Sequence, residues 1–380
     1  MRDVVVVGGG PVGVFLAALL AERGLDVCVW ERRATPATLS RAIGIHPPSL
    51  SAFEAIDVAT AVVEAAVAVR RGVARSRGRT IGSLSFDRVS AAYPFVAALP
   101  QFRTERILTE RLDALAPGAL HRGVELRAID DVSPDFVRLR GRGPTGDVHE
   151  VARFVVGADG ARSAVRHLMG IASELTVYPD AYVMGDFADA SGDATDAVIH
   201  LEPSGVVESF PLPGGVRRYV AHTGAPMASP TPERVASLVA ERTGVSVDAT
   251  TNSMLSAFSV RRRMAANLVR GRIVLIGDAA HEISPIGGQG MNLGWLDAAE
   301  LAPLLVAGSA SAGPDAAALA AFGDHRMHVA RRAARQAEAN MGMGRPIGAV
   351  KRRARDAAFG LLLATPASRL LARTYAMGWA

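Results

Sequence analysis

The sequence predicts an α/β fold in which a parallel sheet and an antiparallel sheet are interleaved along the chain and helices follow at the C-terminus. Near both ends, at residues 3–20 and 273–305, a short apolar run leads through a glycine-rich loop into a helical pattern. Between them, residues 181–221 contain four short apolar segments separated by turn residues, which is typical of an antiparallel sheet. A chain of 380 residues is long enough for two domains.

Composition limits the function classes. Apolar residues make up 49% and charged residues 21%, as in a globular protein. The net charge is +5, but the basic residues are almost all arginines spread along the chain, with Lys351 as the sole lysine and few aromatics, so we expect no nucleic-acid partner. The single cysteine, Cys28, excludes a disulfide framework and a cysteine metal cluster, and we predict no metal site.

Targeting signals are not apparent. The apolar start MRDVVVVGGG is too short and too glycine-rich for a signal peptide, and no run approaches the ~20 apolar residues of a membrane span. We therefore expect a cytoplasmic protein.

The N-terminal motif predicts a dinucleotide site. Residues 3–20 hold a strand pattern, the spacing G-x-G-x-x-G and a helix pattern in direct succession. Gly8 would allow the tight turn, Gly10 the approach of a pyrophosphate, and Gly13 close packing of helix on strand. The next strand ends in Glu31, whose carboxylate could take the ribose hydroxyls.

A second match to this spacing, at residues 141–146, lacks the required context. Pro144 and Gly146 link two strand patterns, 136–139 and 149–152, and no helix follows. We interpret it as a hairpin, which leaves one dinucleotide site in the chain.

The second strand–loop–helix connection places a carboxylate, Asp278, at the C-terminal edge of the strand at residues 273–276. Ligands of open α/β sheets sit outside these edges. The following loop, 287–290, exposes backbone N–H groups and leads at Asn292 into a helix, whose N-terminus suits an anion. An ordinary structural connection is the alternative.

Three isolated residues are further candidates. Arg41 precedes a helix pattern and could form a bidentate pair with a phosphate or remain a solvated loop residue. Gln101 stands just ahead of another helix, where its amide could reach a ligand. Asp159 ends the strand at residues 154–156 and is either a ligand-binding residue or a helix cap.

Three ordered motifs carry a family resemblance: GGGPVG with Glu31, then GADGARSAVR, then GDAAHEISPIGGQGMN. Together they resemble the single-component FAD-dependent hydroxylases of the para-hydroxybenzoate hydroxylase fold, over nearly the whole chain. The tail, with Arg335, Asn340, the triplet 354–356 and LLLATPASRLLARTYAMG, is similar to the ubiquinone-biosynthesis hydroxylases. The implied fold is a Rossmann-type FAD-binding domain with an interleaved antiparallel-sheet substrate domain and a helical C-terminus.

The resemblance implies a set of cofactor contacts. The glycines would bind the FAD pyrophosphate, Asp278 the ribityl side, and the loop 287–292 the flavin ring, while the segment around Asp159 would serve both FAD and the nicotinamide cofactor. The full set is Gly8, Gly10, Pro11, Val12, Gly13, Glu31, Arg32, Arg41, Gln101, Asp159, Gly277, Asp278, Gly288, Gly290, Met291 and Asn292.

The implied reaction is hydroxylation of a phenolic or quinone-precursor-like small molecule. NADH or NADPH would reduce the flavin, O2 would add at flavin C4a, and the resulting hydroperoxide would transfer one oxygen atom. Catalytic candidates are Pro285, which precedes the loop that could stabilise negative charge on the flavin, and His46 or His222 as a base for the phenol. His281 is expected to order its loop.

The resemblance also sets expected boundaries and a substrate region. The FAD-binding domain would comprise residues 1–70, 98–172 and 262–345, the substrate domain 71–97 and 173–261, and the helical segment 346–380. Pocket candidates on the predicted antiparallel sheet are Val183, Phe187, Phe210 and His222.

The C-terminal segment mixes arginines with leucines. It could form a basic amphipathic surface in weak contact with a membrane, or its helices could pack on the FAD-binding domain, which we favour.

Other functions remain open. A flavin-dependent halogenase would carry W-x-W-x-I-P, whereas the tryptophans here are Trp30, Trp295 and Trp379. An FAD-dependent epoxidase, a reductase of isoprenoid double bonds, or a non-catalytic flavin-binding accessory protein would keep the same motifs. The sequence does not determine the substrate, the choice of NADH or NADPH, or the oligomeric state.

Overall fold

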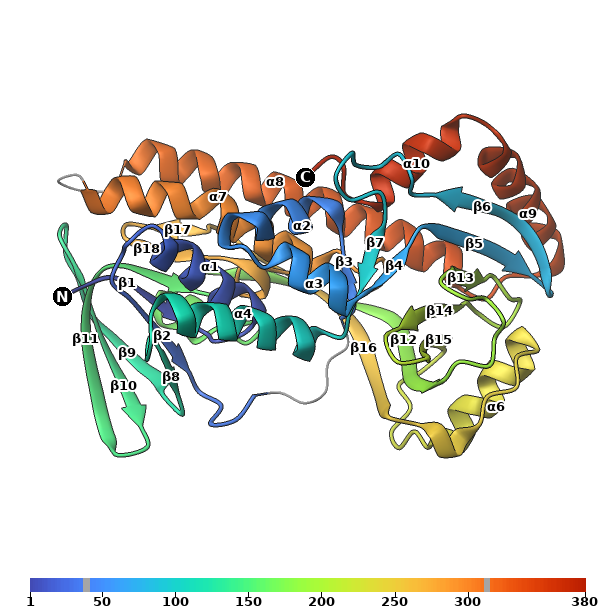
Figure 1. Cartoon of the computed structure of the whole chain (residues 1–380), viewed down its shortest axis with the longest axis horizontal. Coiled ribbons are helices and arrows are strands. Elements are labelled where there is room, and N and C mark those ends of the chain that lie inside the picture. Colours follow the sequence, from blue (N-terminus) through green and yellow to red (C-terminus); the bar gives the residue numbers. More distant parts are fainter. Residues whose placement is uncertain (37–41, 311–314) are drawn as a thin grey trace.

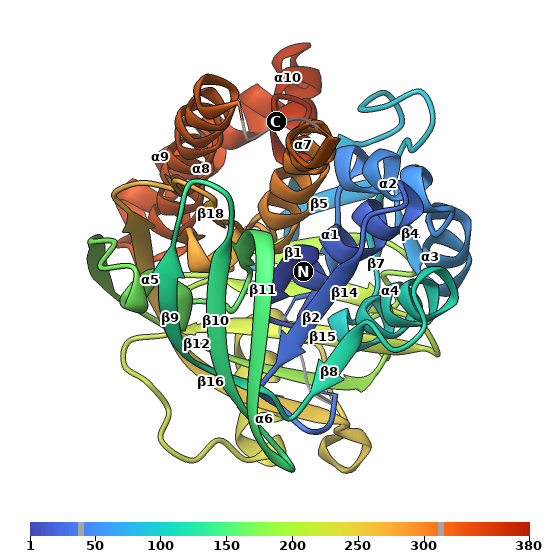
Figure 2. The same ribbon diagram turned by 90° about the vertical axis from the view of Figure 1, so that its left-hand side faces the viewer.

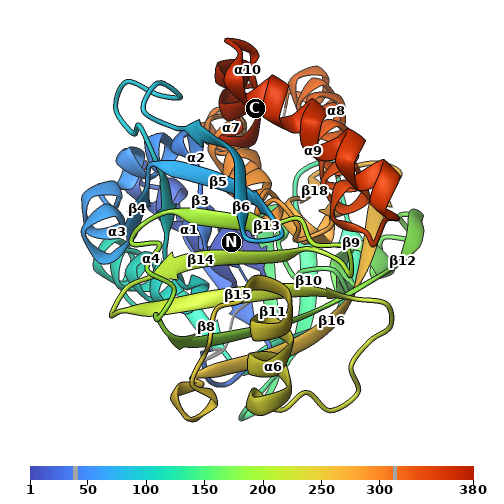
Figure 3. The same cartoon turned by 90° about the vertical axis from the view of Figure 1, so that its right-hand side faces the viewer.

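A computed structural model describes residues 1–36, 42–310 and 315–380. Two large sheets carry the architecture, and helices from both ends of the chain pack between and around them (Figure 1). Figure 2 shows the sheet that contains the N-terminal strand, and Figure 3 shows the second sheet from the opposite side of the molecule.

The first sheet has a parallel centre. Its central strands carry apolar runs, as is typical of parallel strands that are buried on both faces. Strand β1 lies between β2 and β11, and β18 pairs with β11, all in parallel. The strands in spatial order are β17 (Val269–Arg270), β18 (Ile273–Leu275), β11 (Gly146–Gly157), β1 (Arg2–Val7), β2 (Val27–Glu31) and β8 (Leu120–Arg122), with β10 (Val137–Gly143) and β9 (Glu125–Val132) attached to β11.

The hairpin prediction for residues 141–146 is confirmed. Strands β10 and β11 pair antiparallel as far as Gly143 and Gly146, and the turn between them leads into strand, not helix. The backbone of Gly146 has φ +141°, a value that glycine tolerates.

Helices cover both faces of this sheet. One core joins it to α1, α2, α3, α4 and α7, and a second core on the other face includes α8. The helices of the molecule are α1 (Pro11–Glu22), α2 (Pro47–Phe53), α3 (Ala59–Ala65), α4 (Gln101–Leu115), α5 (Ala164–Leu168), α6 (Pro232–Thr243), α7 (Gly290–Ala310), α8 (Ala316–Gly344), α9 (Ala349–Ala364) and α10 (Ala367–Tyr375), with 3-10 turns η1 (Glu54–Ile56), η2 (Ala249–Thr251) and η3 (Gly277–Ala279).

The second sheet confirms the predicted antiparallel strands of residues 181–221 and extends them. All of its pairings are antiparallel except that of β13 with β5. Helix α6 packs on its outer face. In spatial order the strands are β19 (His281–Glu282), β16 (Met254–Ala265), β12 (Ser173–Ala188), β15 (Val216–Thr223), β14 (Val207–Leu212), β13 (Ala197–His200), β5 (Arg71–Ser76) and β6 (Arg79–Ser85).

Three short strands form a third sheet between these two regions. Strand β7 pairs antiparallel with β3 on one side and with β4 on the other. The three are β3 (Gly44–Ile45), β7 (Val96–Ala98) and β4 (Val67–Val69).

The C-terminal helices pack on both regions of the molecule. Helices α9 and α10 contact β6 of the second sheet. Leu363 lies so close to Gly82 that a Cβ atom there would be 2.7 Å from the Cβ of Leu363. The carbonyl of Thr374 of α10 accepts from Nε2 of Gln336 of α8 at 3.5 Å. The expected packing on the FAD-binding region therefore describes only part of their contacts, and the second sheet supplies the rest.

In the described parts of the chain, no helix combines the length and the apolar character needed to cross a bilayer.

Replacing Gly13 by Ala should destabilise the fold. A Cβ atom at Gly13 would lie 1.9 Å from the carbonyl oxygen of Gly8, so helix α1 would have to move away from β1. We expect the free energy of unfolding to fall by about 1–3 kcal/mol. The control is Gly342→Ala in α8, where a Cβ meets no atom within 4 Å, and which should be neutral or stabilise by up to about 1 kcal/mol. Urea denaturation of both variants checks this, and equal effects would contradict it.

Candidate active site

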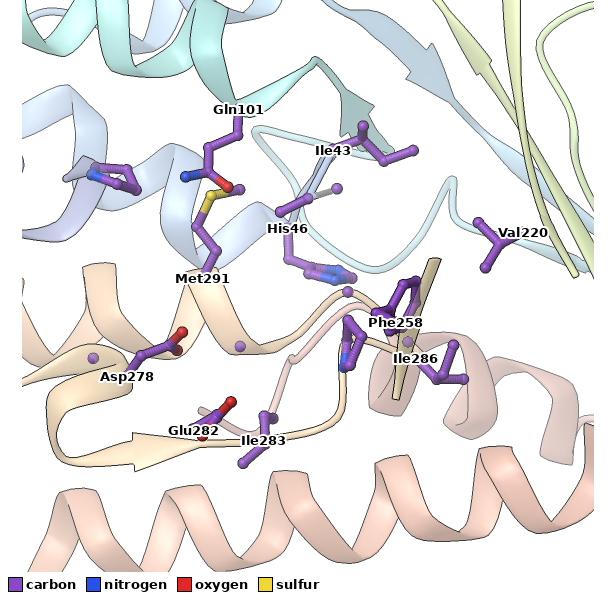
Figure 4. A pocket seen from close by; sticks show the side chains of 18 of the residues that line it. Ile43, His46, Gln101, Val220, Phe258, Asp278, Glu282, Ile283, Ile286 and Met291 are labelled. Carbon is purple, nitrogen blue, oxygen red and sulfur yellow. The ribbon is translucent and has the colours of Figure 1, made fainter. Parts of the chain in front are cut away.

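A cavity of about 960 Å³ lies where the two large sheets and the helices meet. This volume is at the upper end of the range of about 300–1,000 Å³ that small-molecule sites occupy. One end is polar, with Asp278 and Glu282, and the other is apolar, with Val220, Phe258 and Ile286 (Figure 4). His46 lies between the two ends.

The glycine motif forms a cradle at the polar end. Gly8 has φ +112°, and a Cβ atom there would be 2.3 Å from the carbonyl oxygen of Ala158. Gly10 differs, since a Cβ would meet no protein atom within 4 Å, and its outer side faces the cavity. Gly10 is also the N-cap of α1 and brings no capping side chain, so the first N–H groups of the helix stay available to an anion.

Glu31 holds this cradle in shape while it lines the cavity. Its Oε2 accepts from the N–H of Gly9 at 2.8 Å, and its Oε1 accepts from the backbone N–H and Nε of Arg33 at 2.8 and 3.0 Å. Burial favours the neutral acid, but these hydrogen bonds outweigh it and lower the pKa of Glu31. Arg32, Pro11 and Val12 also line the cavity, whereas Gly13 packs behind it.

Asp159 caps a helix and also lines the cavity. Its Oδ2 accepts from the N–H groups of Ala164 and Val165 at 2.6 and 3.1 Å and so caps α5. Its Oδ1 is buried without a hydrogen-bond partner among the described residues, and Asp159 lines the cavity. This oxygen retains its capacity to bind a ligand.

Buried Arg166 links this segment to the loop that carries Asp278. It donates through Nη1 to the carbonyl of Ala279 at 2.7 Å and through Nη2 to the carbonyl of Ala161 at 2.8 Å. The two carboxylates predicted at strand ends, Asp159 and Asp278, are therefore brought to one cavity.

Asp278 projects into the polar end from η3. Its side chain is accessible from the cavity but remote from bulk water, and this desolvation raises its pKa although nearby His281 opposes the change. A group that binds there by donating hydrogen bonds would restore the ionised form.

Behind Asp278 lies a buried ionic network around Asp297 of α7. Its Oδ2 contacts the N–H of Gly277 and Nε2 of His281, each at 2.8 Å, and its Oδ1 accepts from Nε of Arg326 at 2.7 Å. Burial would raise the pKa of Asp297, but His281 and Arg326 lower it to about 2. The expected role of His281 in ordering its loop is confirmed by this contact.

The loop before α7 has the predicted glycine geometry. Gly287 and Gly288 have φ of +97° and +68°, and both line the cavity with Pro285, Gly290 and Met291. The polypeptide backbone therefore forms this wall.

Asn292 is placed differently from the prediction that it contacts the cofactor. It is fully buried, and its Nδ2 donates to the carbonyls of Gly44 and Gly288, each at 2.9 Å. Its Oδ1 accepts from the N–H of His46 at 2.9 Å. With its amide fully used, Asn292 positions the two loops beside the cavity instead of lining it.

His46 lines the cavity with an unsatisfied ring. It is 5% exposed, and neither ring nitrogen makes a hydrogen bond of normal geometry among the described residues, although the backbone of Gly287 and Gly288 lies close to the ring. Burial lowers its pKa to about 4 against the opposing effect of this backbone, so the imidazole is neutral at pH 7. A neutral imidazole can accept a hydrogen bond from a phenol, but the lowered pKa makes it a weak base.

Gln101 and Arg41 were also predicted to contact the cofactor. Gln101 lines the cavity from the start of α4, with its Nε2 donating to Oε1 of Glu105 at 2.6 Å. Arg41 lies outside the described residues.

Three of the four pocket candidates were wrong. Val183 and Phe187 face α6 on the outer side of the second sheet, because odd-numbered residues of this part of β12 point away from the cavity. His222 lies beyond the lining, edge-on to Tyr182, with Nε2 3.2 Å from Oδ1 of Asp180. It therefore has no place as a base in the cavity. Phe210 does line it.

Sequence reasoning missed the contribution of the chain's last helices. Leu363 and Tyr375 line the apolar end, as do Asn340 of α8 and Glu208 of β14. Tyr375 donates through its hydroxyl to Oδ1 of Asn340 at 3.1 Å. A lone carboxylate, Glu208, within the strand pattern of residues 206–210 was the available signal for a polar group on one sheet face.

Comparison with known proteins places the chain among flavoproteins. Residues 1–337 match the family model of the FAD binding domain. The chain is 36% identical over 311 residues to 6-methylpretetramide 4-monooxygenase of Streptomyces rimosus, covering 79% of this chain but 55% of that protein. It thus spans little more than half the length of that curated relative.

Two solved structures share the fold. p-Nitrophenol 4-monooxygenase of Pseudomonas putida DLL-E4 is similar with a TM-score of 0.87 and 26% identity, over 100% of this chain and 97% of that one. A ternary complex of aklavinone-11 hydroxylase with FAD and aklavinone is similar with a TM-score of 0.75 and 27% identity, over 91% and 69% of the two chains.

His46 should make the fold sensitive to acid. Its folded pKa of about 4 lies below the unfolded value of 6.5, so the unfolded chain binds the proton more readily and stability falls as the pH drops from 6.5 toward 4. Between pH 7 and pH 5 this costs about 2 kcal/mol. The difference in unfolding free energy between the wild type and His46→Gln should shift by that amount over this range, measured in urea. Parallel pH curves would contradict the prediction.

Proposed function

The chain belongs to the FAD binding domain family, and from that premise we propose that it is an FAD-dependent monooxygenase. It uses NAD(P)H and O2 to hydroxylate a phenolic or quinone-precursor-like aromatic molecule. The observation that carries this proposal is the continuity of one cavity from the glycine cradle to an apolar chamber, which lets a dinucleotide and a small aromatic molecule meet.

The residues present fit FAD. The open face of Gly10 at the N-terminus of α1 suits a pyrophosphate, and Glu31 at the end of β2 suits the adenosine ribose. Asp278 and the free Oδ1 of Asp159 stand where polar groups of the cofactor would need partners. The backbone wall at Gly287 and Gly288 leaves space for a planar ring.

Bound FAD would supply the redox chemistry, taking electrons from NAD(P)H and activating O2 for transfer of one oxygen atom. The protein's own task is to bind, orient and exclude water. The N-terminus of α7 and the backbone beside Pro285 favour negative charge at the ring. The apolar side chains Val220, Phe258 and Ile286 keep water from the chamber.

We assign to His46 the role of accepting a hydrogen bond from the phenolic hydroxyl. Its ring lies between the polar and apolar ends of the cavity and is neutral at pH 7, but a pKa of about 4 makes it too weak a base to remove the phenolic proton unaided. His222 is not retained for this role, because its ring lies outside the cavity lining and contacts Asp180.

Gly10→Val tests the cofactor site without disturbing the fold. The new side chain would meet no protein atom close to its Cβ, but it would fill the space assigned to the pyrophosphate. We expect FAD affinity, measured by fluorescence titration of the apoprotein, to fall by at least about 100-fold, or about 2.7 kcal/mol. Apoprotein stability should change by no more than about 1–2 kcal/mol, the range for changes at an N-cap. Unchanged FAD affinity would contradict the assignment.

The activity is tested with the purified protein loaded with FAD. NADPH and NADH oxidation is followed with and without a panel of phenols, and products are examined by mass spectrometry. We expect at least one phenol to stimulate oxidation and to yield a product heavier by one oxygen atom. Stimulation by olefins alone, or none by any aromatic compound, would count against the hydroxylase.

A further inference from the structure

Glu208 places a carboxylate in the apolar half of the cavity. It lies on β14, with Ile199 of β13 and Val220 of β15 as its cross-strand partners, and all three side chains line the cavity. Phe210, two residues further on the same face of β14, also lines it. Glu208 is thus an acid in a surface otherwise built for an aromatic molecule.

No hydrogen bond or ion pair to this carboxylate occurs within residues 1–36, 42–310 and 315–380. Burial raises the pKa of Glu208 to about 7, and no neighbouring cation offsets that effect. The charge of Glu208 contributes to raising the pKa of two nearby tyrosine hydroxyls, Tyr375 of α10 and Tyr182 of β12, after the larger effect of their burial. The side chain is half-buried and opens only to the cavity, and an unpaired acid withdrawn from bulk water in this way destabilises a fold, so its presence is better explained by a ligand than by structure.

Asp186, another acid on this face of the sheet, differs from Glu208 because its carboxylate is paired with an arginine. Asp186 of β12 is held by Arg218 in a bidentate pair, with Nε and Nη2 each 2.7 Å from a carboxylate oxygen. This pair engages the arginine that β15 presents to the cavity, so a substrate carboxylate would have to compete with Asp186 for it. Glu208 would in addition repel such a substrate.

We propose that Glu208 accepts a hydrogen bond from a hydroxyl group of a neutral aromatic substrate and excludes aromatic substrates that carry a carboxylate. The inference rests on the proposed function for the reaction in which this selection operates. It names the substrate class by charge: uncharged aromatic molecules that present a hydroxyl group to β14.

Ligand binding tests this directly, without turnover. Naphthol and naphthoate have the same ring system and differ in charge. Their dissociation constants for the FAD-loaded protein can be measured by isothermal titration calorimetry at pH 8, where Glu208 is mostly ionised. We expect the wild type to bind naphthol at least about tenfold more tightly, since a hydrogen bond to a charged group contributes about 1.5–3 kcal/mol. In Glu208→Gln, naphthol should bind several-fold more weakly and naphthoate more tightly, so that the preference falls by at least about tenfold.

Two further variants complete the test. Glu208→Leu, which removes the buried acid and matches its apolar surroundings, should also lose the preference and serves if the glutamine variant folds poorly. Glu233→Gln, on the exposed first turn of α6, changes charge equally and should retain the wild-type preference. Equal binding of the two ligands by the wild type, or a preference that survives both Glu208 substitutions, would overturn the inference. Because neither NAD(P)H nor O2 is needed, a protein that fails to hydroxylate phenols could still show the preference, and the two failures are distinguishable.

Discussion

The geometry of the site depends on the buried carboxylate of Asp297. It holds the N–H of Gly277 and the ring of His281, which are the two ends of the loop that carries Asp278. Arg326 of α8 fixes the same carboxylate from behind. A charge with no exposed surface is tolerated because all of these partners are in place. Removing Asp297 would take this shared partner from Gly277, His281 and Arg326, so the position of Asp278 is coupled to the packing of α7 and α8.

Around this anchor, polar groups divide into two kinds. Some lie behind the cavity and are satisfied, as the saturated amide of Asn292 and the carboxylate of Asp297 show. Others face the cavity and keep unused capacity, among them the ring of His46 and one oxygen of Asp159. Glu208 continues this series into the apolar half. Buried polar groups need hydrogen-bond partners for the fold to be stable, whereas groups that face the cavity can take their partners from a bound polar ligand.

Local patterns predicted local geometry well. The strand, glycine and helix order at the N-terminus and the turn at residues 141–146 have strict stereochemical requirements that residue types reveal. The sequence could not predict which side chains of β12 face the cavity. Residues 181–184 are all apolar, so no alternation of apolar and polar residues distinguishes the two faces of the strand. Asp297 and the lining by Tyr375 were equally hidden, because they depend on contacts between segments remote in sequence.

The remoteness of these segments has a consequence for biosynthesis. The ribosome produces the glycine cradle first and the strand β18, which completes the parallel centre of the first sheet beside β11, only after residue 270. The wall formed by Leu363 and Tyr375 follows nearly a hundred residues later, or roughly 5–20 seconds at typical elongation rates. During that interval the apolar half of the cavity is open on the side of β6. A nascent chain at this stage would expose apolar surface that α9 and α10 cover in the folded protein, the kind of transient exposure that favours aggregation.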